Sequence, residues 1–243
     1  MSVKELLKRY VYVHKCAGCG EILDYSHSDN AFCDMCQLDW NAAIVESCAA
    51  CMKPARECAC MPKLLERSGA LTLRKLFFYK SESSRSPSMS TIFWLKYKKS
   101  GRIIRFVGEN IAELVRDELS ALGDTAAENI LVTNAPRSLR SMREIGYDQS
   151  AEVARQISRL LSLRYERVFS SVTKKQKQLN AGERRRNAER NIGMEKTDVK
   201  GKYVVIFDDM VTTGASLSAC VRLLMKAGAA GVLCFSLASK NNK

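Results

Sequence analysis

The sequence contains only two histidines, His14 and His27, and both lie among the cysteines near the N-terminus. The remaining residues therefore offer no histidine as a general base, which excludes histidine-assisted nucleophilic catalysis there. No run approaches the ~18 consecutive apolar residues that suggest a membrane-spanning helix. Charged residues interrupt the apolar positions of residues 1–12, so this stretch lacks the core of a signal peptide. We therefore expect a cytoplasmic protein that is not integral to a membrane.

The composition indicates a folded chain with an uneven charge. A length of 243 residues with 46% hydrophobic content suits one ordinary domain plus a small appendage. Residues 1–60 hold six Lys and Arg against eight acids, a net charge of −2. Since the whole chain has a net charge of +13, residues 61–243 carry +15. A basic body is typical of proteins that attract polyanions such as nucleic acid, phosphate-rich ligands or anionic lipid. The alternative is a basic solvated surface without a partner.

Eight of the ten cysteines fall between residues 16 and 60, in four close pairs. Two thiolates on a tight turn can ligate one tetrahedral Zn2+, and a second pair completes the shell. In a cytosolic chain this pattern favours metal over disulfides. Pairing of neighbours predicts one site from Cys16, Cys19, Cys33 and Cys36 and a second from Cys48, Cys51, Cys58 and Cys60. A cross-braced arrangement, with the first pair joining the third, is the alternative.

These sites predict a small N-terminal domain that metal helps to fold. Residues 1–66 cannot bury enough apolar surface alone, so we assign them to a zinc-ribbon or knuckle domain and residues 67–243 to the main domain. Trp40 and Leu38 are expected to pack the knuckle onto the main domain. Four thiolates leave no open position for water, so the Zn2+ has a structural role. His14 could substitute as a ligand, but a lone histidine beside a cysteine pair is more often a bystander.

The most informative stretch is 203–216, which reads YVVIFDDMVTTGAS. Val204–Phe207 is an apolar run typical of a strand buried on both faces of a parallel sheet, and we expect it to end at Asp208. A loop rich in hydroxyls and glycine then leads into a helix, whose N-terminus can hold phosphate. Asp208 and Asp209 can accept from a vicinal diol or help to hold hydrated Mg2+. Together these features predict a ribose 5-phosphate site, although acidic turn residues with a Thr N-cap are the simpler interpretation.

This stretch closely resembles the phosphoribosyl diphosphate (PRPP) motif of type I phosphoribosyltransferases. The resemblance implies PRPP with Mg2+ as the ligand. The ligand-binding residues it implies are Asp208, Asp209, Met210, Val211, Thr212, Thr213, Gly214, Ala215 and Ser216. The two acids are also the only catalytic candidates.

Three further segments are strongly basic. Residues 92–105 interleave Trp94 and Tyr97 with five cations, which suits single-stranded nucleic acid, although a helix with outward lysines explains them equally well. Residues 134–143 follow a predicted strand and form a second candidate anion site. Residues 172–192 carry seven Lys and Arg, and we expect their first part to be a mobile loop that serves as a lid or grips nucleic acid. The candidate contacts with diphosphate or DNA are Lys96, Lys98, Lys99, Arg102, Arg137, Arg140, Arg143, Lys174, Lys175, Lys177, Arg184, Arg185 and Arg186.

The periodicity predicts an α/β fold with a parallel sheet. The expected strands are 71–79, 129–133, 204–207 and 231–237. The expected helices are 106–122, 149–163 and 217–227. Residues 81–90 are rich in serine and are expected to form an exposed loop. Cys220 and Cys234 fall on apolar faces and are expected to be buried.

The combination resembles the ComF family of competence proteins over nearly the whole chain. The resemblance is carried by the paired cysteines, Leu95-Lys96-Tyr97, residues 146–149 (GYDQ), residues 176–187 and VVIFDDMVTTGAS. The chain departs from the family pattern at Asn134-Ala135 and at Ile145. The resemblance implies a zinc knuckle on a type I phosphoribosyltransferase-like domain. It also implies a role in natural transformation, with single-stranded DNA and the uptake machinery at the cytoplasmic face of the inner membrane as partners.

Three functions follow as hypotheses. The first is a PRPP-binding protein that handles incoming single-stranded DNA. The second is an active phosphoribosyltransferase, whose acids and Mg2+ stabilise an oxocarbenium-like transition state while an amine or base displaces diphosphate. No glutaminase domain is expected, since such a domain needs its own nucleophilic cysteine and residue 2 is Ser. The third is a PRPP-responsive transcriptional regulator, although no helix-turn-helix with its turn glycine is evident.

Overall fold

The computed structural model describes residues 14–24, 27–79, 86–123, 127–137, 139–171 and 192–241. Its centre is a five-stranded sheet in the order β1-β7-β6-β2-β3, in which every neighbouring pair is parallel. The strands are β1 (Thr72–Tyr79), β2 (Ile130–Asn134), β3 (Arg164–Tyr165), β6 (Tyr203–Val211) and β7 (Gly231–Lys240). The expected α/β fold with a parallel sheet is confirmed.

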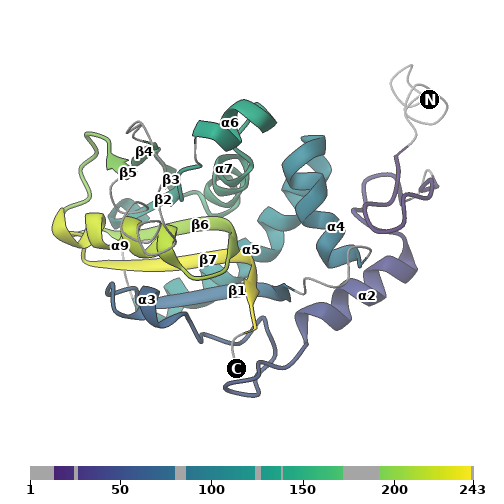
Figure 1. Cartoon of the computed structure of the whole chain (residues 1–243), viewed down its shortest axis with the longest axis horizontal. Coiled ribbons are helices and arrows are strands. Elements are labelled where there is room, and N and C mark those ends of the chain that lie inside the picture. Colours follow the sequence, from purple (N-terminus) through teal and green to yellow (C-terminus); the bar gives the residue numbers. More distant parts are fainter. Residues whose placement is uncertain are drawn as a thin grey trace, which may run out of the picture.

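Helices cover both faces of this sheet (Figure 1). On one face, α5 (Gly101–Ala121) and α7 (Gln149–Leu161) pack against a core that includes Val205, Phe207 and Leu233. On the other, α9 (Ala215–Lys226) packs with the short α3 (Lys63–Glu66), and Leu65 is fully buried there. Because helices lie on both sides, the central strands carry continuous apolar runs such as Val204–Phe207 of β6, as is typical of a doubly covered parallel sheet.

Serine caps account for two differences between the expected and the observed helices. Ser100 Oγ accepts from Ile103 N at 3.4 Å and starts α5 at Gly101, where the sequence suggested residue 106. Ser86 Oγ accepts from Met89 N at 3.3 Å, and Pro87 occupies the first turn of α4 (Pro87–Phe93). Part of the expected 81–90 loop is therefore helical, since Ser is a strong N-cap and Pro suits the first helical position.

A π-helical turn, η2 (Trp94–Lys98), joins α4 to α5 and ends at Lys99, which has a φ of 46°. Turns of this kind are rare and are frequent at functional sites. The segment is therefore helical in overall form, with Leu95 buried and Tyr97 60% exposed.

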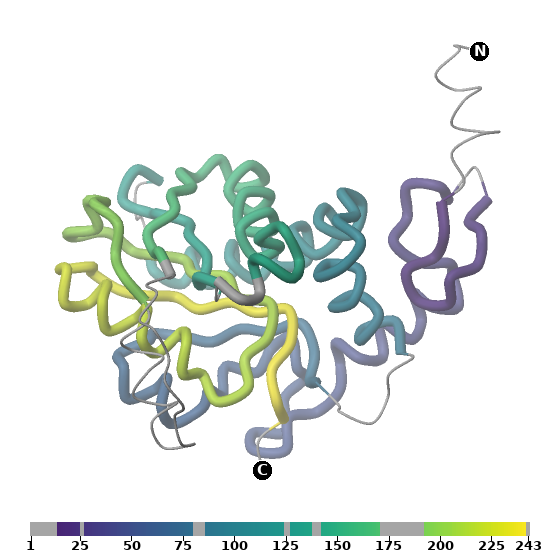
Figure 2. The backbone as a smooth tube through the Cα atoms, turned by 45° about the horizontal axis from the view of Figure 1, so that its top comes forward, coloured from purple at the N-terminus to yellow at the C-terminus, as the bar shows by residue number. Residues whose placement is uncertain are grey.

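The N-terminal part lies at one end of the molecule, beyond α4 (Figure 2). Its helix, α2 (Asp34–Ile44), buries Trp40 against Phe77 of β1 and Phe106 of α5, with ring centroids 5.6 and 4.9 Å away. The expected packing of Trp40 is thus observed. The same expectation for Leu38 is wrong, because this side chain lies on the outer face of α2 and is 61% exposed.

The remaining elements flank this framework. They are η3 (Ala127–Asn129), α6 (Leu139–Ile145) and an antiparallel pair, β4 (Phe169–Ser171) and β5 (Ile192–Met194). The basic loop expected over 172–192 lies almost entirely outside the described residues, and β5 begins at its last residue. Among the described residues, no helix combines the length and apolar character needed to cross a bilayer.

Candidate functional site

Asp208 and Asp209 lie inside β6, near the edge where the parallel strands end. The strand continues to Val211 because β7 goes on pairing with it, Asp208 opposite Ser236 and Val211 opposite Ser239. The expectation that the strand stops before the acids is therefore wrong. Its neighbour β2 ends at Asn134, opposite Phe207, so the loop after β2 begins beside the acids. The ends of parallel strands are the usual ligand position in open α/β sheets.

The turn between β6 and α9 is open. Together with Asp208, residues 210–217 line a cavity of about 60 Å³, well above the ~10–15 Å³ that admits one water. Thr212 and Thr213 are exposed. In the described part of the chain, no side chain caps the N-terminus of α9, which starts after Gly214. Its first N–H groups are therefore suited to an anion.

Gly214 is required in this turn for two reasons. Its φ is 72°, and a Cβ there would lie 3.2 Å from Leu65 Cβ of α3. We expect Gly214→Ala to lower the free energy of unfolding by about 1–3 kcal/mol, since the left-handed backbone strains an alanine. A ligand phosphate at this turn would also bind more weakly. Urea titration and calorimetry with a phosphorylated sugar measure both effects. Gly123→Ala is the control, with a φ of 78° and no atom within 4 Å; similar ligand affinity in both variants would contradict the role of the turn.

Three side chains from three different elements converge on Asp209 Oδ2. Gln149 Nε2 at the start of α7 donates at 2.5 Å, Arg137 Nη2 from the loop after β2 lies at 3.2 Å, and Lys96 Nζ from η2 lies at 3.7 Å. The side chains of Arg137 and Asp209 are only 11% and 13% exposed. Two of the predicted cations, Lys96 and Arg137, thus meet one of the predicted acids.

Asp208 has a different environment. Its Oδ1 accepts from the backbone N–H of Asp209 at 2.9 Å, and it is the acid that lines the cavity. Burial, followed by the neighbouring Asp209 carboxylate, raises the pKa of Asp208 well above its ordinary value. The two acids therefore differ: Asp209 pairs with cations, whereas Asp208 faces the cavity in a setting that disfavours its charge.

The GYDQ segment positions α7 beneath this cluster. Asp148 caps the helix by accepting from Ala151 N at 3.1 Å, and it also accepts from Asn134 Nδ2 at 3.2 Å. Asn134 Oδ1 in turn accepts from Tyr165 OH at 2.8 Å. Neither Gln149 nor Asn134 is among the individual binding residues predicted from the sequence, although Asn134 begins the second candidate anion site at 134–143. Their positions, one at a strand end and one at a capped helix start, are the signal that could have found them.

The other predicted cations are dispersed. Lys98, Lys99 and Arg143 are exposed. Arg102 instead donates to the carbonyls of Lys15, Ser28 and Asn30 in the N-terminal segment. The side chain of Arg140 and all of Lys174, Lys175, Lys177, Arg184, Arg185 and Arg186 lie outside the described residues.

The cysteines gather into two separate clusters. They are Cys16, Cys19, Cys33 and Cys36, and Cys48, Cys51, Cys58 and Cys60, with the four sulfur atoms of each within 4.8 Å of one another. This is the arrangement that pairing of neighbours predicts, and the cross-braced alternative does not occur. Cys19 and Cys33 sulfurs are 3.8 Å apart, which matches the ~3.8 Å edge of a tetrahedron with Zn–S distances of about 2.3 Å.

The surroundings of the first cluster fit a thiolate-bound metal. Cys16 Sγ accepts from the N–H groups of Gly18 and Cys33, both at 3.3 Å. Burial opposes ionisation, but these and the Cys19 N–H bring the pKa of Cys16 down to about 7. A Cβ on Gly18 would lie 2.6 Å from Cys36 Sγ, so only glycine admits the fourth sulfur. The donor set therefore suits structural Zn2+.

Comparison with known families identifies the domain that carries the acids. Residues 148–243 match the family described as "Phosphoribosyl transferase domain". This segment includes Asp148 and Gln149 of the GYDQ sequence, the two acids Asp208 and Asp209, and the turn before α9. The chain contains a phosphoribosyltransferase-like domain. No curated protein matches the chain.

Solved structures of phosphoribosyltransferases resemble the chain weakly. An allosteric regulatory enzyme of purine biosynthesis is 20% identical with a TM-score of 0.35, over 55% of this chain and 25% of that one. Hypoxanthine phosphoribosyltransferase from Trypanosoma cruzi is 16% identical with a TM-score of 0.38, over 56% and 67%. The Staphylococcus aureus enzyme is 13% identical with a TM-score of 0.35, over 57% and 68%. Values this low add no argument to the family match.

Proposed function

We propose that this protein binds PRPP at the end of β6 and handles single-stranded DNA during natural transformation, aiding DNA internalisation across the inner membrane. The observation that carries the first part is the open turn before α9, beside two acids at the end of a parallel strand. The second part rests on the resemblance to ComF proteins and on the net charge of +15 outside residues 1–60. The protein would act in the cytoplasm, with the DNA-uptake machinery as a partner at the membrane.

The residues of the site divide the work of binding PRPP. The N–H groups at the start of α9, with Thr212, Thr213 and Ser216, would take the 5-phosphate. Asp208 and Asp209 would accept from the ribose hydroxyls or hold hydrated Mg2+, which supplies charge neutralisation for the diphosphate when bound. Lys96 and Arg137 already lie at Asp209 and would face the diphosphate.

An exposed aromatic pair supports the DNA-binding part. Phe93 and Tyr97 are 49% and 60% exposed, and their ring centroids are 5.1 Å apart. Lys98 and Lys99 follow directly, and Lys99 Nζ lies 5.0 Å from the ring centroid of Tyr147. Exposed rings beside lysines are the arrangement on which bases stack while cations contact the backbone.

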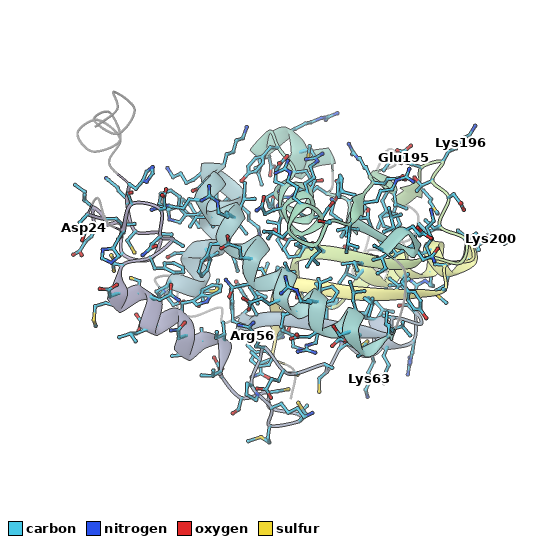
Figure 3. The ribbon with its side chains drawn as sticks, turned by 180° about the vertical axis from the view of Figure 1, so that it is seen from behind. Asp24, Arg56, Lys63, Glu195, Lys196 and Lys200 are labelled. Carbon is cyan, nitrogen blue, oxygen red and sulfur yellow. The ribbon has the colours of Figure 1, made fainter. Side chains whose placement is uncertain are left out.

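We expect Lys98→Ala with Lys99→Ala to weaken single-stranded DNA binding and to reduce its salt dependence. Two lost phosphate contacts lower the slope of log K against log salt by about 1.4. Fluorescence titrations of a labelled oligonucleotide, with and without PRPP and Mg2+, measure the slope and any coupling. Lys196→Ala with Lys200→Ala removes the same charge at the end of the molecule that lies opposite Asp24 (Figure 3). Equal slopes for the two pairs would remove η2 from the DNA interface.

An active phosphoribosyltransferase is the second candidate, and the family match is equally compatible with it. It predicts diphosphate release when PRPP and an amine or base are mixed with the protein, whereas pure binding predicts none. A PRPP-responsive regulator would instead prefer a specific duplex sequence. Diphosphate release and duplex competition therefore separate the three functions.

We also propose that the cysteine clusters hold structural Zn2+, one ion in each. The supporting observations are the sulfur separations and the backbone N–H groups around Cys16. The division into a zinc domain over 1–66 and a phosphoribosyltransferase-like domain over 67–243 belongs to the same proposal. Leu65 packs against α9, so the end of the first segment contacts the second directly.

A further inference from the structure

Lys75 is an unusual residue for the interior of a sheet. It lies in β1 and is 1% exposed, whereas lysines are almost never fully buried without a partner. Among the described residues, no carboxylate forms an ion pair with it, and the adjacent Arg74 pairs with Glu118. A buried ammonium without a compensating negative charge is costly. The charge that balances Lys75 must therefore come from a group other than an acidic side chain of the described chain.

The contacts of Lys75 lead to the second cysteine cluster. Its Nζ donates to the carbonyl oxygen of Cys60 at 2.7 Å and lies 3.5 Å from that of Leu73. Its Nζ also lies 5.9 Å from the ring centroid of Phe78 in the same strand, and Phe78 belongs to one buried cluster with Cys48 and Cys58. A buried cation thus donates directly to the backbone of one of the four cysteines of this cluster.

A tetrathiolate centre supplies the missing charge. Four thiolates around one Zn2+ leave a net charge of −2, and in a buried setting this charge needs nearby cations or N–H donors. We propose that Lys75 is the charge partner of the metal centre in the second cysteine cluster, so that a strand of the phosphoribosyltransferase-like domain controls metal retention in the N-terminal segment. The proposal rests on the metal-binding role proposed above. Lys75 acts as a positioning residue, not as a ligand.

The first cluster shows a related arrangement. Arg102 of α5 reaches into the N-terminal segment and donates to the carbonyl of Lys15, next to Cys16, and to that of Asn30 at 2.6 Å. Each cluster therefore receives one long cationic side chain from the other part of the chain. Arg102 is partly exposed and screened by water, whereas Lys75 is fully buried. The effect of the charge should consequently be largest at Lys75.

The test measures zinc retention in the zinc-loaded full chain. Lys75→Met keeps the size and apolar stem of the side chain but removes its charge. We expect the second zinc to leave about 10- to 100-fold faster in the presence of a chromogenic chelator, while the first zinc leaves at the wild-type rate. Lys63→Met, which removes an exposed charge three residues after Cys60, should behave as wild type (Figure 3). Cobalt substitution adds a spectroscopic count of thiolates in each variant.

Two further measurements separate charge from hydrogen bonding. Lys75→Gln keeps a donor for the Cys60 carbonyl but carries no charge. If the charge holds the metal, this variant should lose the second zinc as fast as Lys75→Met does. With zinc bound, the wild type should melt at a higher temperature than Lys75→Met. Without zinc the order should reverse, because the wild type then retains a buried charge without compensation and Lys75→Met does not. Equal zinc retention in wild type and Lys75→Met, or retention restored by Lys75→Gln, would overturn the proposal. A wild-type chain that holds fewer than two zinc ions would overturn it together with the metal-binding role.

Discussion

Replacing Asp209 by Asn is expected to weaken PRPP–Mg2+ binding by about 100-fold. The variant would lose two charge-assisted interactions of the Asp209 carboxylate with the ribose hydroxyls or hydrated Mg2+, each worth about 1.5 kcal/mol or more. Each 1.4 kcal/mol of binding free energy is tenfold in affinity. Asp209 is the acid on which Lys96, Arg137 and Gln149 converge. An asparagine there carries no charge to hold Lys96 and Arg137, so these cations would also lose their alignment with the diphosphate.

Calorimetry with PRPP and Mg2+ measures this effect. Asp117→Asn is the matched control, since Asp117 is exposed on α5. Three partners at a nearly buried carboxylate predict that the substitution also lowers the free energy of unfolding by about 1–3 kcal/mol. Binding should therefore be measured well below the melting temperature. Wild-type affinity in a folded Asp209→Asn variant would contradict the sugar-phosphate site.

The pH dependence of the site follows from Asp208. Burial and the neighbouring Asp209 carboxylate raise the pKa of Asp208. Asp208 therefore keeps its proton at pH values above about 4, the ordinary pKa of an aspartate. Because Mg2+ and ribose hydroxyls interact better with the ionised carboxylate, affinity should rise with pH through the folded-state pKa. Stability runs the other way: the folded chain holds a proton that the unfolded chain releases, so the free energy of unfolding falls as pH rises over that window. Asp208→Asn should flatten both profiles.

Removal of zinc is expected to unfold residues 14–60 cooperatively. Zinc binding to small tetrathiolate units is worth roughly 10–16 kcal/mol, which is comparable to the whole stability of a domain. Trp40 and Phe32 belong to the same apolar core as Leu76 and Phe77 of β1, so loss of the metal should also loosen that face of the sheet. Tryptophan emission and metal content, followed during chelation, report the two events together.

Gly18→Ala tests the same prediction without a chelator. Its Cβ would lie 2.6 Å from Cys36 Sγ, so we expect loss of one zinc per chain and a red shift of the buried Trp40. Gly101→Ala is the control, because nothing lies within 4 Å of a Cβ at that position. Full zinc content with unchanged emission in Gly18→Ala would show that the first cluster does not hold metal in the way proposed.

The sequence predicted the framework because local patterns dominate there. The apolar run at 204–207 and the amphipathic helices reflect burial that any parallel sheet with two covered faces imposes. The errors arose where a neighbour decides the outcome. The length of β6 depends on β7, which keeps pairing past Asp208, and the start of α5 depends on a single capping hydroxyl at Ser100.

The amino-acid sequence by itself determined the chemistry of this protein: two acids before a hydroxyl-rich turn, and eight cysteines in close pairs. Only the tertiary structure decided which groups meet. It brought Lys96, Arg137 and Gln149 to one oxygen of Asp209, separated the cysteines into two clusters and placed Lys75 beside the second. The physical reason is that these contacts join segments distant in the chain, whose approach is set by packing against a shared sheet rather than by local propensity.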